Sequence, residues 1–213
     1  MNTSWTARKM VRSLGLLALL GAGGGAGAVA IEGQIRNVAQ VKAQLGEQDV
    51  RVLLANFTEG RIVGLSTLRG GLFSIDIPAS FRPATAPMNV CSGVTARPSE
   101  PRTYIAESLL VYQAGKNSAA LLFQADHPTE PTRRTQWVYS DRASTIQGRC
   151  TGLNSYYDLK LRRGWTAVMT TSESGAFRVT NATPGLPYWV QGAFTPNARA
   201  VYGSLFGRES LSR

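Results

Sequence analysis

Apolar and polar residues alternate with a period of two along most of this chain. In residues 72–78, LFSIDIP, Phe73, Ile75 and Ile77 alternate with Ser74 and Asp76. A strand with one buried and one solvated face has this pattern, because successive side chains point to opposite sides of a sheet. Comparable runs begin at residues 31, 50, 61, 103, 119, 135, 144, 156, 165, 176 and 188.

Turn-forming residues separate these runs, as in AGKNS at 114–118 and HPTEP at 127–131. Many short strands with turns between them predict an all-β fold: a β-sandwich with one large or two small antiparallel domains. The proline-rich stretch 78–101 is predicted to be irregular. The helical spacing of Val38, Val41 and Leu45 favours a short helix, with a loop as the alternative, and the tail from residue 197 is expected to fray.

The N-terminus has the pattern of a secretory signal. Basic residues between 8 and 12 precede a charge-free stretch from Ser13, and Ala28-Val29-Ala30 fits the small-x-small cleavage rule. We therefore predict a signal peptide over residues 1–30, with an uncleaved anchor as the alternative. The predicted mature chain divides into a β-sandwich at 31–98, a second β-rich region or continuation of the same sandwich at 99–205, and a tail at 206–213. No transmembrane span is expected in the mature chain.

The segment GQIRN, VRVLLANFTEG and STLRGGLFSIDIP resembles the carboxypeptidase regulatory-like, or transthyretin-like, β-sandwich domain of exported bacterial proteins. The matching elements are Gly33 to Ile35, Val50 to Leu54 and Gly71 to Pro78. The resemblance covers about residues 31–78 and implies a sandwich domain. The closing Gly-x-Tyr strand of that family does not follow Pro78.

The Gly-x-Phe-x-aliphatic pattern occurs again at residues 174–190, SGAFRVTNATPGLPYWV. It closes the first sheet after a long insertion, or it belongs to a second sandwich. Between these two segments, WVYSDRASTIQGRC and YYDLKLRRGWTAVM resemble bacterial envelope proteins of unassigned function, which implies a sandwich sheet and no particular activity.

The chain is basic, with 23 Lys and Arg against 13 Asp and Glu. A basic, arginine-rich surface can attract a polyanion such as an envelope phosphate polymer or nucleic acid. The alternative is a basic surface that reflects an arginine-favouring genome, with its charges spread over many strands and loops. The adjacent pairs Arg133-Arg134 and Arg162-Arg163 are the candidate polyanion contacts, and we expect them on one side of the molecule. Tyr156 and Tyr157 are candidate ligand contacts that point to opposite faces, so that one is exposed.

The two cysteines, Cys91 and Cys150, are predicted to form one disulfide, since the chain is expected to be exported. Free thiols or half of a metal site are the alternatives. Trp137, Trp165 and Trp189 lie at strand positions where large rings usually fill a core.

Little in the sequence points to catalysis. The sole histidine, His127, is in a loop-like stretch, and no Gly-x-Ser-x-Gly motif or phosphate-binding loop occurs in the predicted mature chain. No cofactor, metal site or specific nucleic acid is expected. We predict an exported, non-catalytic protein of the periplasm, cell envelope or extracellular space with a structural or adhesive role. A binding module for an anionic or carbohydrate polymer is the alternative, and a hydrolase is a third.

Overall fold

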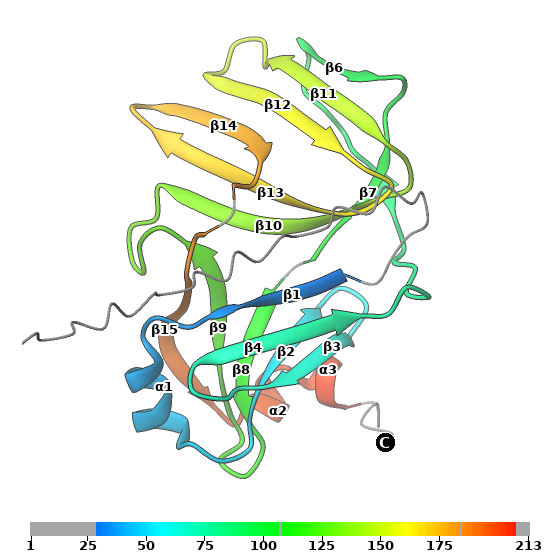
Figure 1. The fold of residues 1–213 in the computed structure, drawn as a ribbon. Helices are drawn as coiled ribbons and strands as arrows, with labels where there is room; N and C mark the ends of the chain where they lie inside the picture. Colours follow the sequence, from blue (N-terminus) through cyan, green and yellow to red (C-terminus); the bar gives the residue numbers. More distant parts are fainter. Residues whose placement is uncertain (1–28, 107, 184, 208–213) are drawn as a thin grey trace, which may run out of the picture.

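The computed structural model describes residues 29–106, 108–183 and 185–207. The predicted signal segment, residues 1–30, lies outside the described residues except for Val29 and Ala30, which begin the first strand. Strands make up most of the described part, and the fold is all-β and sandwich-like, as the alternation of the sequence predicts. Figure 1 shows a lower half, which holds both ends of the described chain, and an upper half.

The lower half is a sandwich of two layers. One layer is an antiparallel ribbon of β1 and β4, with Ile31 opposite Ile75 and Gly33 opposite Phe73. The other is the lower part of a larger sheet, in the order β3-β2-β8-β9-β15. The bounds are β1 (Val29–Gln34), β2 (Val50–Asn56), β3 (Arg61–Thr67), β4 (Leu72–Ile77), β8 (Ser108–Gln113), β9 (Ser118–Ala125) and β15 (Tyr188–Pro196).

A first core fills the space between these two layers. The inward side chains of the ribbon are the apolar residues of the alternating pattern, and they meet inward residues of the larger sheet. The members that are almost fully buried include Ile31, Ile75 and Ile77 of the ribbon and Val52, Leu54 and Val111 of the sheet. The candidate helix is present as α1 (Val38–Leu45), whose Val41 and Leu45 enter this core.

The upper half continues the larger sheet. Arg134 pairs with Ala125 and Thr135 with Gln124, which joins β10 to β9. From there the order is β10-β13-β14-β12-β11-β6, with β12 and β14 parallel, while β7 pairs with both β10 and β5. The bounds are β5 (Ala86–Pro87), β6 (Val94–Arg97), β7 (Arg102–Ile105), β10 (Arg133–Ser140), β11 (Ser144–Arg149), β12 (Ser155–Leu161), β13 (Gly164–Glu173) and β14 (Ala176–Asn181).

The upper sheet curls around a second core, to which six of its strands contribute. Its buried members are Val94, Val138, Ile146, Cys150, Leu159, Leu161, Val168 and Val179. The predicted disulfide is present beside this core: Cys91 is bonded to Cys150, with Cα atoms 5.4 Å apart. It fastens the segment before β6 to the end of β11, where Val94 pairs with Gly148.

Three local predictions differ from the structure. The stretch 78–101 holds the short strands β5 and β6, and the apolar run from residue 103 to 113 is two strands, β7 and β8. The fraying expected from residue 197 is wrong for the described part of the tail, because α2 (Ala198–Val201) and α3 (Gly203–Phe206) form there. Ala198 and Leu205 are buried in a third core, against the face of the lower sheet that points away from β1 and β4. Among the described residues, no helix has the length and apolarity needed to cross a membrane.

Candidate functional site

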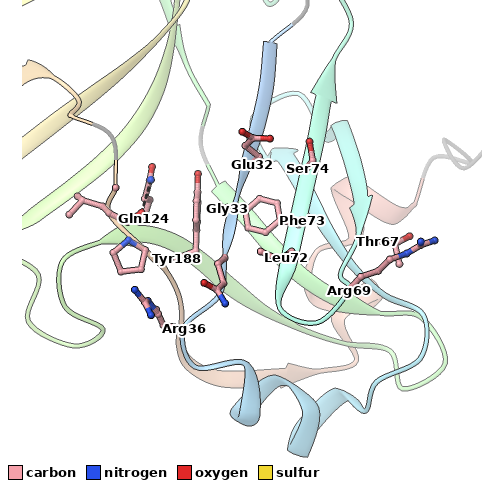
Figure 2. A pocket seen from close by; sticks show the side chains of 14 residues that line it. Glu32, Gly33, Arg36, Thr67, Arg69, Leu72, Phe73, Ser74, Gln124 and Tyr188 are labelled. Atoms are coloured by element: carbon pink, nitrogen blue, oxygen red, sulfur yellow. Dashed lines mark hydrogen bonds between the residues drawn. The ribbon is translucent and has the colours of Figure 1, made fainter. Parts of the chain in front are cut away.

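An open groove of about 720 Å³ lies over the outer face of the β1–β4 ribbon. We call it the ribbon groove. Figure 2 shows β1 and β4 running through it, with Tyr188 and Gln124 on one side and Thr67 and Arg69 on the other. It is lined by Glu32, Gly33, Gln34, Arg36, Thr67, Arg69, Leu72, Phe73, Ser74, Gln124, Gly185, Leu186, Pro187 and Tyr188.

The alternating pattern of the ribbon produces the floor of this groove. Because the isoleucines of β1 and β4 face the first core, the residues between them face outward. These outward residues include Glu32, Ser74 and Leu72, and the side chain of Leu72 is 57% exposed. The floor is therefore mixed, with one large apolar side chain among polar ones.

Tyr188 and the residues before it build one wall. The ring of Tyr188 packs directly on Gly33, where an added Cβ would lie 2.4 Å from two ring carbons. The ring also meets the edge of Phe73, with centroids 4.9 Å apart. The amide of Gln124 donates to the carbonyl of Leu186 at 2.8 Å. The wall is thus held in place by packing and by a hydrogen bond within the protein.

Burial raises the pKa of the Tyr188 phenol to about 12. The indole of Trp137 lowers this pKa and the Glu32 carboxylate raises it further, but burial is the dominant cause. A phenol with so high a pKa is protonated at neutral pH and is unsuited to act as a base there. Tyr188 therefore serves the groove as a packed wall.

The polar side chains of the loop between β9 and β10, which contains His127, form hydrogen bonds within that loop. Asp126 accepts hydrogen bonds from the Thr132 hydroxyl at 2.7 Å and from the backbone N–H of Arg133 at 3.0 Å. Its pKa falls to about 2: partial burial acts to raise it, but these hydrogen bonds and the Arg133 side chain outweigh burial. His127 Nδ1 accepts the N–H of Glu130 at 3.2 Å. Within the described residues, no three His, Cys, Asp or Glu side chains are placed to hold a metal ion.

The structure does not bring the two arginine pairs together. In the ladder of β10 and β13, Arg133 is opposite Thr171, whereas Ser140 is opposite Gly164, the residue after Arg163. The pairs therefore lie at opposite ends of this ladder, separated by the length of β10. Arg133 forms an ion pair with Asp126 at 3.4 Å, and Arg134 lies over the Phe123 ring. Arg162 donates from Nε to the carbonyl of Trp165.

The two tyrosines point to opposite faces of β12, as the alternation predicts. Tyr157 packs against the second core, and Tyr156 lies on the outer face. The expectation that one of them is exposed is wrong, because both are half-buried. Tyr157 is covered by the second core, and the guanidinium groups of Arg149 and Arg178 lie over Tyr156, 5.3 Å and 4.8 Å from its ring centroid. Neither arginine stands out in the sequence, because only the order of the strands places both beside Tyr156.

The three tryptophans differ in burial. Trp165 belongs to the first core at 5% exposure, and Trp137 packs against that core while remaining partly exposed. Trp189 is half-buried, and its indole N–H donates to the Ala125 carbonyl at 3.1 Å. These rings are used in packing between and beside strands.

Comparisons of this chain with protein-family profiles, with curated proteins and with solved structures give no match. The functional interpretation therefore depends on the geometry of its own residues.

Proposed function

We propose that this chain is an exported, non-catalytic β-sandwich protein with a structural or adhesive role in the cell envelope or periplasm. Its adhesive element is the ribbon groove, which holds an extended segment of another envelope protein. The observation that carries the proposal is the exposed Leu72 in the ribbon groove, beside the packed wall at Tyr188.

The backbone of β1 supports an extended occupant. The N–H of Ile35 donates to the Gly71 carbonyl at 2.8 Å. Counting back from Ile35 along the ladder, Gly33 and Ile31 also direct their backbone N–H and C=O groups toward β4. In an antiparallel pair, alternate residues direct their N–H and C=O groups to the other edge of the strand. Glu32 is one of these residues in β1. At the end of the same edge the Arg36 N–H already donates to the Tyr188 carbonyl at 2.9 Å, so an added strand would pair with β1 before that contact. A peptide strand added at such an edge gains main-chain hydrogen bonds, and side-chain contacts such as Leu72 give selectivity.

One feature supports an exported protein, and a second is compatible with removal of the predicted signal peptide. The Cys91–Cys150 disulfide is typical of oxidising compartments. Cleavage after Ala30 would also leave most of β1 in place, because Ile31 to Gln34 keep their partners Leu72 to Ile75 in β4.

A matched pair of leucine substitutions tests the proposal. Leu72 lies in the ribbon groove and Leu153 lies in the turn between β11 and β12, and their exposures are 57% and 58%. Each is replaced by arginine in the full chain, produced in the native cells, and the share of protein that sediments with washed envelopes is measured. Leu72→Arg is expected to release the protein, whereas Leu153→Arg leaves it bound.

The folding of both variants is checked by their unfolding midpoints, which should match that of the unchanged protein. If Leu72→Arg remains on the envelope as firmly as Leu153→Arg, the groove is not the attachment site. If the unchanged protein does not associate with the envelope at all, the adhesive role is overturned.

A further inference from the structure

Three strands of the upper sheet assemble an arginine–tyrosine–arginine row, in which the two arginines are exposed and the tyrosine is half-buried. Arg149 of β11 is opposite Tyr156 of β12, and Tyr156 is level with Arg178 of the parallel neighbour β14. Figure 1 shows these strands side by side at the top of the molecule. Because Tyr157 and Leu159 enter the second core, alternation places this row on the opposite, outer face of the sheet.

The row continues across two more strands. Arg178 is opposite Thr171 of β13, and Thr171 is opposite Arg133 of β10. Four strand spacings of about 4.8 Å give the row a length of about 19 Å. It therefore carries three arginines across five strands.

The charges at the β11 end of the row are available to a ligand. Arg149 and Arg178 are exposed, and neither forms an ion pair within the described part of the chain. Arg149 donates one hydrogen bond, from Nε to the Leu153 carbonyl at 3.3 Å. Arg133, at the other end of the row, forms an ion pair with Asp126. The nearest acid along β12 on the same face is Asp158, which accepts a hydrogen bond from the Gln147 amide at 3.0 Å.

The tyrosine ring positions the two guanidinium groups. A guanidinium over an aromatic face is held by cation–π attraction, while its N–H groups at the rim stay free to bind an anion as a fork. Two cations close to one ring also repel each other, and an anion between them relieves that repulsion. Because two guanidinium groups already lie over the Tyr156 ring, a base or a sugar that stacked on it would have to compete with them.

We infer that the Arg149–Tyr156–Arg178 row is a binding site for a linear polymer with repeated phosphate groups, recognised by charge and not by base or sugar identity. The row is distinct from the ribbon groove, since the two share no residue. Guanidinium groups bind phosphate oxygens in bidentate fashion, and a row that crosses successive strands suits an extended chain with regularly spaced anions.

The test uses the full chain and two probes, inorganic polyphosphate and single-stranded oligothymidylate, with affinity measured over a series of salt concentrations. Each phosphate contact adds about 0.7 to 0.9 to the slope of log K against log salt. Arg149→Ser/Arg178→Ser is therefore expected to lower affinity at least about tenfold and to reduce the slope by about 1.4 to 1.8. The probe that binds identifies the source of the phosphate.

The matched control is Arg162→Ser/Arg163→Ser, which removes the same charge at the far end of the β10–β13 ladder. It is expected to leave the salt slope nearly unchanged. Equal losses in the two double variants, or no binding of either probe to the unchanged protein, would overturn the site. Tyr156→Leu separates positioning from charge, because it keeps both arginines but removes the ring, and we expect it to weaken binding about threefold or more through loss of the cation–π contacts.

Discussion

The Cα atom of Gly33 in β1 lies directly against the phenol ring of Tyr188 in β15. An ideal Cβ at Gly33 would be 2.4 Å from both Cδ2 and Cε2 of that ring. The last strand of the fold thereby packs on the first, and Tyr188 also reaches Phe73 of β4. The segment 185–190 thus contributes to the first core, while the preceding strand β14 belongs to the upper sheet.

This close approach predicts that Gly33→Ala destabilises the protein. The new methyl group cannot be accommodated unless the Tyr188 ring or β1 moves, and such overpacking costs about 1 to 3 kcal/mol. The free energy of unfolding in urea measures the loss. Gly203→Ala is the control, because a Cβ there meets no atom within 4 Å. An equal and small effect in both variants would contradict the packing argument.

A pair of hydrogen bonds between Asn37, after β1, and Val190 of β15 predicts that Asn37→Asp lowers the free energy of unfolding. The Asn37 amide donates from Nδ2 to the Val190 carbonyl at 3.0 Å, and its Oδ1 accepts the Val190 N–H at 3.0 Å. Aspartate loses the donor and places a carboxylate against a carbonyl oxygen. We expect a loss of about 1 to 3 kcal/mol in the free energy of unfolding. Asn89→Asp, at an exposed loop position, should leave that energy nearly unchanged.

The strands could be predicted where the alternation is clean and a turn residue marks each end. Residues 50–56, 61–67 and 176–181 are strands with the expected bounds. Prediction fails between 103 and 113, because the apolar run has no glycine or proline to mark the break. The break in this run follows from long-range pairing, because β7 pairs with β10, whereas β8 pairs with β2 and β9.

The candidate sites were harder to predict, because they depend on strand order. Adjacent residues of a strand point to opposite faces, so an adjacent pair such as Arg133-Arg134 does not itself form a surface. Arg149, Tyr156 and Arg178 are neighbours only because β12 lies between β11 and β14. The parallel pairing of β12 with β14 has no signal in the local pattern. The ribbon groove likewise needs Tyr188, whose packing on Gly33 is a long-range contact.

The C-terminal helices predict that Leu205→Ala is strongly destabilising. Leu205 is 1% exposed and packs in the third core, although the small and polar composition around it predicted fraying. Truncating a buried leucine removes apolar burial and leaves a cavity, which costs about 2 to 5 kcal/mol. Val201→Ala serves as the control, since Val201 is 60% exposed. Similar unfolding midpoints for the two variants would show that the helices do not hold the lower sheet.

Acid should weaken the β9–β10 turn through Asp126. The pKa of this carboxyl is depressed to about 2 from 3.8, so the folded state binds the proton less readily than the unfolded state. The stability it contributes is present above pH 3.8 and is lost as the pH falls toward 2. Asp126→Asn lacks this titration. The stability difference between the unchanged protein and Asp126→Asn is therefore expected to shrink over that window, and a constant difference would contradict the assignment.

Loss of the disulfide should destabilise the upper half most. The bond joins residues 59 apart in sequence and sits beside the β6–β11 pairing and the second core. Chain-entropy reasoning assigns a loop of this length about 4 kcal/mol, and small secreted domains lose about 2 to 5 kcal/mol without such a bond. Cys91→Ala/Cys150→Ala should show a loss in this range by urea unfolding. Amide exchange is expected to accelerate in β6 and β11 before it does in β2 and β8. Reduction of the unchanged protein provides the control, because it breaks the link and keeps both side chains. If the reduced protein remains as stable as the oxidised one, the disulfide does not hold the upper half together.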